Sequence, residues 1–188
     1  MSKIFIIRHG QDTDNVQKIL NGRHDTELTD LGKEQARQAA KNLRSELKAE
    51  TITAVYVSPL KRCRQTADII TQELGLPPAE IHQDLTERDF GFFTGQKVAD
   101  IRKLSDDYII TDQVDYFLSG EGVEQFPDVY QRALKVMDLM KTKHLAENIV
   151  LVTHGDFGKM LRAAYYGWTW EQGLKTPYFA NTEILTLQ

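Results

Sequence analysis

The sequence predicts an α/β protein with a mostly parallel sheet that helices cover on both faces. Three observations predict it: five short apolar segments, helical patterns between them, and two strands that end in matching His-Gly pairs. Strands that alternate with helices form parallel βαβ units. Because no repeat, low-complexity tract or Pro/Gly-rich linker interrupts the pattern, we expect one domain over residues 1–188.

Five apolar segments are typical of strands. The first, IFII at residues 4–7, contains no polar residue and therefore suits a strand buried on both faces. The others are predicted at residues 52–57, near Ile81, at 149–153 and at 184–187.

Helical periodicity predicts four helices between these strands. In the first, apolar residues recur at helical spacing after Thr29, a suitable N-cap residue. The second is predicted to begin with Ser58 as N-cap and Pro59 in its first position, and to end at Gly75. The third and fourth are predicted at about residues 127–145 and 155–166.

The least regular segment, at about residues 94–126, is predicted to be an insertion over one edge of the sheet. From Leu104 to Gln131 the sequence contains seven acidic residues and no lysine or arginine. The simplest interpretation of this acidic cap is a solvated surface loop. If it instead lies over a pocket, its charge should disfavour a second anionic group on the ligand.

Composition restricts the partners. The formal net charge of −4 argues against nucleic acid. No apolar stretch is long enough to span a membrane or to form a signal-peptide core. The single cysteine, Cys63, lies on an apolar helical stripe, which fits a packing role and a reducing cytoplasm. We therefore expect a cytoplasmic protein with neither nucleic acid nor membrane as partner, and leave its oligomeric state open.

Two histidines follow strands in matching contexts. Residues 150–158, VLVTHGDFG, repeat the pattern of the opening IFIIRHG. Ligands of open α/β sheets bind beyond the carboxyl ends of the strands. We therefore expect His9 and His154 to lie together, with Arg8 beside them and Gly155 allowing close approach to the backbone. Arg62 joins them from the first turn of the second predicted helix.

Two arginines, two histidines and helix N-termini favour a compact dianion such as a phosphoryl group. A metal site is the competing interpretation of paired histidines, but the sequence has no H-E-x-x-H motif and the arginines would repel a cation. It also lacks the G-x-S-x-G motif of a serine nucleophile. A neutral His9 imidazole could attack phosphorus instead. From the residues alone, Glu87 is one carboxylate among 27 that could move a proton.

Five blocks resemble motifs of the histidine phosphatase superfamily, in its cytoplasmic branch related to cofactor-dependent phosphoglycerate mutases. The likeness covers nearly the whole chain. The blocks are RHG at 8–10 with Asn15; Gly22, Arg23 and Asp25 with Leu28, Thr29, Gly32, Gln35 and Ala36; Ser58, Pro59 and Leu60 with Arg62 and Gln65–Ala67; Leu85, Glu87, Gly91 and Gly95; and His154 with Gly155.

The resemblance implies a three-layer α/β/α sandwich that uses no metal and no cofactor. It implies that His9 is the phosphorylated nucleophile and that Glu87 donates and accepts the proton. His154 would act with them on the phosphoryl group. The substrate-binding residues would be Arg8, Asn15, Gly22, Arg62 and Gly155.

A phosphatase acting on small phosphomonoesters is favoured over a mutase. Mutases of the family are longer and grip the substrate carboxylate with an arginine pair in the cap, whereas the acidic cap here has no basic residue. A phosphoglycerate mutase is the first alternative, and an inactive module that binds phosphorylated ligands is the second. Asp12 and Asp156 depart from the family pattern, and the sequence leaves open both their orientation and the physiological substrate.

Overall fold

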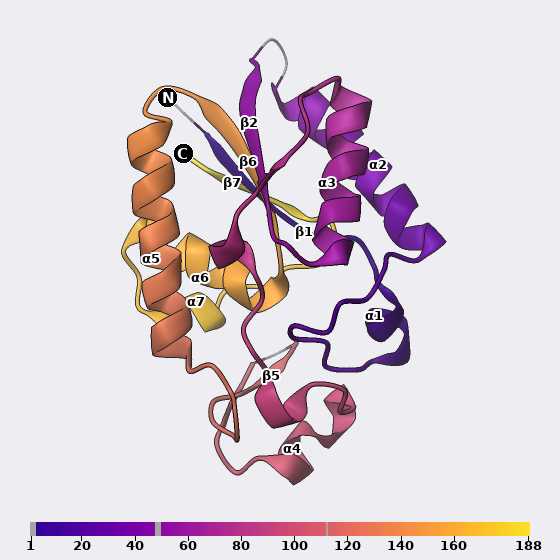
Figure 1. The fold of residues 1–188 in the computed structure, drawn as a ribbon. Coiled ribbons are helices and arrows are strands. Elements are labelled where there is room, and N and C mark those ends of the chain that lie inside the picture. The colour runs from indigo at the N-terminus through magenta and orange to yellow at the C-terminus, as the bar shows by residue number, and fades with distance from the viewer. Residues whose placement is uncertain (1–2, 48–49, 112) are drawn as a thin grey trace.

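The computed structural model describes residues 3–47, 50–111 and 113–188, and within these ranges the central sheet has five strands. Their spatial order is β3-β2-β6-β1-β7 (Figure 1). The antiparallel pair is β1 with β7, and the other pairs are parallel. The predicted strands are confirmed, as β1 (Ile4–Arg8), β2 (Ile52–Val57), β3 (Glu80–Ile81), β6 (Asn148–Thr153) and β7 (Ile184–Leu187).

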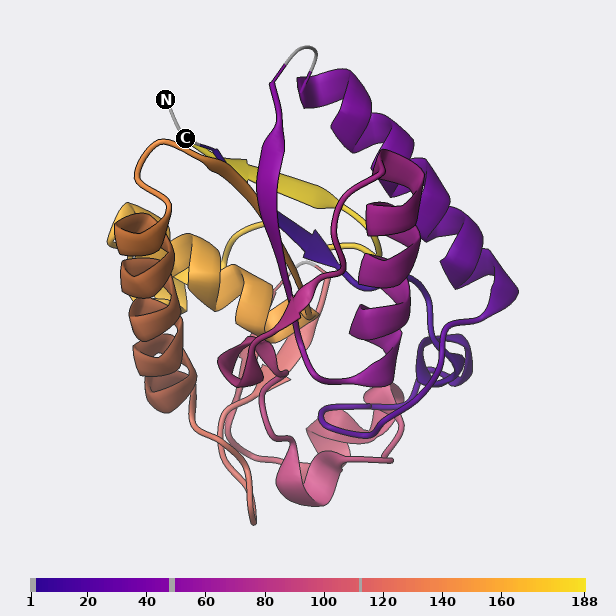
Figure 2. The same cartoon turned by 45° about the horizontal axis from the view of Figure 1, so that its top comes forward.

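Helices cover both faces of this sheet (Figures 1 and 2). Successive side chains of a strand point to opposite faces. Phe5 and Ile7 accordingly pack with the helices of one face, and Ile4 and Ile6 with those of the other. The three-layer α/β/α sandwich is thus confirmed. The first face carries α2 (Asp30–Leu47) and α3 (Lys61–Leu74), and the second carries α5 (Phe126–Lys143), α6 (Gly155–Tyr166) and α7 (Trp170–Leu174).

The start of α3 differs from the prediction. The helix begins at Lys61 with Leu60 as its N-cap residue, so Ser58 does not cap it and Pro59 lies before its first turn. Ser58 instead directs its hydroxyl to His154, with Oγ 2.7 Å from Nε2. Ser58 follows β2 and His154 follows β6, so the two side chains meet across the sheet. This hydrogen bond takes the place of the predicted helix cap.

Other helix boundaries follow the sequence closely. Gly32 N donates to Thr29 Oγ1 at 3.0 Å, the bond expected of an N-cap residue. Gly75 ends α3 with a φ of 69°, which glycine adopts without strain. Cys63 packs in the core as predicted, and its burial raises the pKa of the thiol. Three short helices, α1 (Thr13–Gln17), α4 (Ile101–Leu104) and α7, were not predicted.

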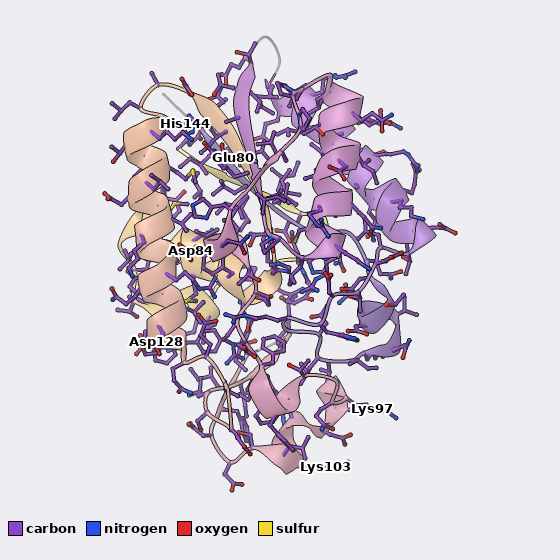
Figure 3. All side chains as sticks on the ribbon, in the orientation of Figure 1. Glu80, Asp84, Lys97, Lys103, Asp128 and His144 are labelled. Atoms are coloured by element: carbon purple, nitrogen blue, oxygen red, sulfur yellow. The ribbon has the colours of Figure 1, made fainter. Side chains whose placement is uncertain are left out.

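The segment predicted as an insertion lies beyond the carboxyl ends of the parallel strands (Figure 1). It has a small apolar cluster of its own, formed by Phe90, Phe93, Ile101, Phe117 and Val123. Figure 3 shows Lys97 and Lys103 on its outer side. Its elements, with the turn before it, are the 3₁₀ helices η2 (Gly91–Phe93) and η3 (Val98–Asp100), helix α4 (Ile101–Leu104) and the paired strands β4 (Tyr108–Ile110) and β5 (Asp115–Phe117).

The acidic residues of the insertion are spread out, and two of the six that the structure describes form ion pairs. Asp115 lines the cavity described below and pairs with Arg102 at 2.7 Å. Glu124 pairs with two arginines from outside the stretch. Asp128 lies in the first turn of α5 (Figure 3), and Asp112 lies outside the described residues. Among the six of these seven acids that the structure describes, Asp115 lines this cavity and the others do not.

The loop after β1 packs backbone to backbone against the start of α2. A Cβ atom at Gly32 would lie 2.1 Å from the Gln11 carbonyl oxygen. Because that oxygen belongs to the backbone of the His9 loop, Gly32→Ala should lower the free energy of unfolding by about 1–3 kcal/mol. Urea denaturation measures this change. The exposed neighbour Glu34, replaced by alanine as control, should change it by less than about 0.5 kcal/mol, and equal losses would contradict the argument.

Candidate active site

The register of the sheet places the two histidines side by side. Arg8 at the end of β1 pairs with Thr153 at the end of β6, and His9 N donates to the Thr153 carbonyl at 2.9 Å. The next residue after β6 is His154. The centroids of the His9 and His154 rings are 5.3 Å apart. The two HG pairs, predicted to lie together, thus form one site at the edge of the sheet.

Arg62 bridges the two histidines. Its side chain is fully buried, with Nε 3.2 Å from His9 Nε2 and Nη2 3.0 Å from His154 Nδ1. Two further N–H groups donate to the carbonyls of Gly22, at 2.7 Å, and His24, at 2.6 Å. Gly22 therefore acts through its carbonyl on Arg62 and does not line the cavity.

Asp12 faces Arg62 and the first turn of α1. Its carboxylate accepts from Asn15 N at 2.7 Å, Asn21 Nδ2 at 2.7 Å and Thr26 Oγ1 at 3.1 Å. It lies 3.4 Å from Arg62 Nε. Since all these partners are donors, this buried carboxylate helps to hold Arg62 in place and answers the question of orientation that the sequence left open.

Hydrogen bonds fix the form of both imidazoles. His9 Nδ1 lies 2.8 Å from the Gly10 carbonyl, which can only accept, so the lone pair is on Nε2. His154 Nδ1 accepts from Arg62, so its proton is on Nε2, beside Ser58 Oγ. Burial, followed by the charge of Arg62, lowers the pKa of both rings well below its usual value. Both histidines are therefore neutral near pH 7.

Arg8 has a buried N–H group with no acceptor. Its Nη1 donates to the hydroxyl of Tyr178 and, at 2.8 Å, to the carbonyl of Phe179. Its Nε has no partner among the described residues, and a Cβ atom at Gly155 would lie 3.7 Å from it. A buried N–H without an acceptor is costly and rare in folded proteins, so this atom indicates a place for a ligand acceptor.

Glu87 lies at the N-terminus of α6, just after the 3₁₀ helix η1 (Gln83–Leu85). It accepts from the backbone N–H groups of Arg88 at 2.9 Å, Phe157 at 3.0 Å and Asp156 at 3.3 Å. Burial and the charge of Asp156 raise its pKa, and these hydrogen bonds oppose the rise only in part. A carboxyl group with a raised pKa at a cavity wall is suited to proton transfer near neutral pH.

A cavity of about 340 Å³ opens beside these groups. Of the residues that the sequence singled out, Arg8, Asn15, Glu87 and Gly155 line it, whereas His9, Arg62 and His154 are buried and do not. Its outer wall is mainly apolar and comes from the loop after α1, from η3 and α4, and from the residue before β5. The lining residues of that wall include Ile19, Leu20, Val98, Ile101 and Val114.

The sequence did not single out several residues of this site. Asn181 Nδ2 donates to the His9 carbonyl at 2.9 Å and to Asn15 Oδ1 at 3.1 Å. Asn181 and Tyr178 lie between α7 and β7, where no periodic pattern gives a signal. The topology brings them in, because β7 returns antiparallel beside β1. Ser58 belongs to one of the blocks that resemble the superfamily, but the sequence predicted it as a helix N-cap and not as a partner of His154.

Within the described ranges, no group of three or more His, Cys, Asp or Glu side chains is placed to hold a metal ion. The helices in the same ranges are all too short or too polar to cross a membrane.

The fold and the site together define an α/β sandwich with neutral histidines between buried arginines at the carboxyl ends of its strands. Comparison with protein families agrees with the sequence motifs: the model of the histidine phosphatase superfamily (branch 1) matches residues 4–188. The chain belongs to this superfamily.

Known relatives include both phosphatases and mutase-like proteins. "Phosphoglycerate mutase-like protein 4" of Arabidopsis thaliana is 34% identical over 157 residues, which are 82% of this chain and 66% of that protein. The "Metal-independent phosphoserine phosphatase" of the same plant is 30% identical over 168 residues, 88% of this chain and 68% of that protein. The solved phosphoserine phosphatase of Entamoeba histolytica, in complex with 3-phosphoglyceric acid, has a TM-score of 0.77 at 25% identity, covering 99% of this chain and 90% of that one.

Proposed function

We propose that the protein is a metal-independent phosphatase that hydrolyses small phosphomonoesters through a phosphohistidine at His9. The observation that carries the proposal is the buried Arg8 Nε, which has no hydrogen-bond partner among the described residues and belongs to the residue before His9, in a site with neutral histidines and Arg62. Such a cluster offers donors to a dianion and a free lone pair to its phosphorus. Relatives with phosphatase names support the same class of reaction.

In the first step, the phosphoryl group enters between Arg62 and His9, and its oxygens replace the direct contact between these side chains. The lone pair of His9 Nε2 forms the P–N bond while the bond from phosphorus to the ester oxygen breaks. Glu87 gives its proton to the departing oxygen. Arg8, Arg62 and the N-terminus of α6 stabilise the charge on the equatorial oxygens, and His154 holds Arg62 in place by accepting at Nδ1.

In the second step, water replaces the alcohol. The Glu87 carboxylate accepts a proton from the water, whose oxygen attacks phosphorus as the P–N bond breaks. The electron pair returns to His9 Nε2, inorganic phosphate leaves, and Glu87 is again protonated. A single carboxyl group can serve both steps because burial and Asp156 raise its pKa.

A mutase would also need a fixed partner for the substrate carboxylate. Of the cations that line the cavity, Arg88 pairs with Asp156 at 3.0 Å, and Arg8 donates to Tyr178 and Phe179. The Lys159 ammonium donates to the Tyr116 hydroxyl and the Leu174 carbonyl, and Lys18 is exposed. The stretch from Leu104 to Gln131 supplies no cation. We therefore keep hydrolysis as the proposed reaction, with transfer to a second hydroxyl as the alternative.

The proposal treats residues 1–188 as one domain and assigns no cofactor, nucleic acid or membrane partner. It places the protein in the cytoplasm, which the single cysteine favours.

The decisive experiment uses ³²P-labelled p-nitrophenyl phosphate and protein treated with excess chelator. We expect turnover to persist and an alkaline quench to trap labelled protein, whose phosphate is then released by acid and retained in alkali. Turnover that depends on added Mg²⁺ would contradict metal independence. Tight binding of phosphate esters without any turnover would instead support the binding-module alternative.

A further inference from the structure

Tyr116 and Lys159 contact each other at the wall of the cavity. Lys159 Nζ donates to the Tyr116 hydroxyl at 2.9 Å and to the Leu174 carbonyl at 2.7 Å. Both side chains line the cavity, and both residues are buried, with 4% of Tyr116 and 3% of Lys159 exposed. A lysine held in this way is fixed in position, unlike the mobile ammonium groups of surface lysines.

Tyr116 and Lys159 each have a hydrogen-bond donor that no described residue accepts. A phenol that accepts a hydrogen bond from an ammonium group keeps its own hydrogen, and no residue in the described part of the chain accepts it from Tyr116. The Lys159 ammonium has three N–H groups, of which two are used. Because both residues line the cavity, the unused donors are available to a ligand there.

An acceptor lies in the same cavity. Asp156 Oδ2 is held by Arg88 Nε at 3.0 Å, whereas Oδ1 has no hydrogen-bond partner among the described residues. Asp156 also lies close enough for its charge to act on the pKa of both Tyr116 and Lys159. The wall therefore offers donors and an acceptor together.

A hydroxyl group matches this arrangement because it can both accept and donate. A carboxylate or a second phosphate could accept from Lys159 but could not donate to Asp156 Oδ1, whose negative charge would oppose it. We propose that Tyr116, Lys159 and Asp156 form a subsite for a hydroxyl group on the alcohol part of the phosphate ester. The proposal rests on the proposed function and deepens it by naming hydroxylated alcohols as the leaving-group class.

The position of the subsite agrees with this role. Asp156 follows Gly155 directly, and its backbone N–H contacts Glu87, the group that would protonate the departing oxygen. Lys159 lies about one turn further along the same helix, α6. Asp156 and Lys159 thus extend the site along α6 from Glu87, and Tyr116 reaches it from β5.

The test is a series of ω-hydroxyalkyl phosphates with two to six carbons, each compared with the n-alkyl phosphate that carries methyl in place of hydroxyl. At the chain length that reaches the subsite, we expect kcat/KM to be about 10-fold or more higher for the hydroxyl compound. Tyr116→Phe removes one oxygen and Lys159→Met keeps the side-chain volume, and each should reduce this preference to near unity.

Lys18→Met is the matched control, because Lys18 also lines the cavity but is exposed and makes no contact with the subsite. It should keep the hydroxyl preference. Equal rates at every chain length, a preference that survives both subsite variants, or a stronger preference for ω-carboxyalkyl phosphates would overturn the subsite. None of these results would affect the proposed function, which would fail only if every ester in the series remained unhydrolysed.

Discussion

Alanine in place of His9 should lower kcat for p-nitrophenyl phosphate by about 10⁴-fold or more, since removal of an enzyme nucleophile has effects of this order. Without the His9 Nε2 lone pair, water would have to attack the bound ester directly. The arginines would remain to bind phosphate, so KM should change far less than kcat. Steady-state kinetics and alkaline-quench trapping of labelled protein measure the two consequences, and the label seen with the wild-type protein should be absent.

Two further histidine variants distinguish loss of the nucleophile from the general effect of removing a histidine. His154→Ala should slow turnover but still form the labelled protein, because His9 keeps its lone pair. His144→Ala is the matched control: Figure 3 shows His144 at the end of α5 farthest from the insertion, and its ring contacts Tyr56 and Glu147. Labelled protein from His9→Ala, with phosphate on another residue, would remove His9 from its proposed role.

The strands and most helix ends could be predicted from sequence because they depend on local patterns. IFII is apolar at every position and suits a strand between two helical layers, and both layers do pack on it. Gly75 ends α3 because its left-handed conformation is a property of the residue itself. The shared HG pattern after β1 and β6 also predicted a common location, since parallel strands end at the same edge.

Contacts made through distant segments could not be predicted in this way. Tyr178 and Asn181 reach Arg8 and the His9 loop only because β7 returns beside β1. Ser58 shows a different reason: a serine before Pro59 suits a helix cap, and only the position of β6 makes His154 the better partner. Tertiary geometry decided between two local possibilities there.

The sequence gives the number of charged residues in a segment, but it does not show which of them form ion pairs in the fold. The acidic stretch predicted a negative rim, but Asp115 pairs with Arg102, which lies just outside the stretch. Asp12 was a concern beside an anion site, yet four donors surround it and one of them is Arg62. Selectivity for the leaving group is therefore more directly argued from cavity-lining groups such as Tyr116 than from net charge.

Glutamine in place of Glu87 should slow the phosphorylation step about 10²- to 10⁴-fold for alkyl phosphates, the usual range for general acid catalysis. The same change should cost p-nitrophenyl phosphate less than about 10-fold, because its leaving group is a weak base and needs little protonation. The amide oxygen of glutamine can still accept from Arg88 N and Phe157 N, so the fold of the site should be retained.

The pH dependence gives an independent test, and its sign follows from the pKa shifts. The raised pKa of Glu87 keeps the acid protonated to higher pH than an ordinary glutamate, and activity towards alkyl phosphates should fall as pH rises through that pKa. The lowered pKa of His9 keeps the nucleophile neutral, so activity should fall only as pH drops through a value well below its usual one. The wild-type protein should therefore be most active between these two limits.

Single-turnover rates under saturating substrate isolate the phosphorylation step, because the same carboxylate also activates water in the second step. In Glu87→Gln the alkaline limb should disappear while the acid limb, which belongs to His9, should remain. An unchanged alkaline limb would assign it to another group. Equal losses for alkyl and p-nitrophenyl phosphate in this step would mean that Glu87 stabilises the site without donating the proton, and that the departing oxygen is protonated from elsewhere.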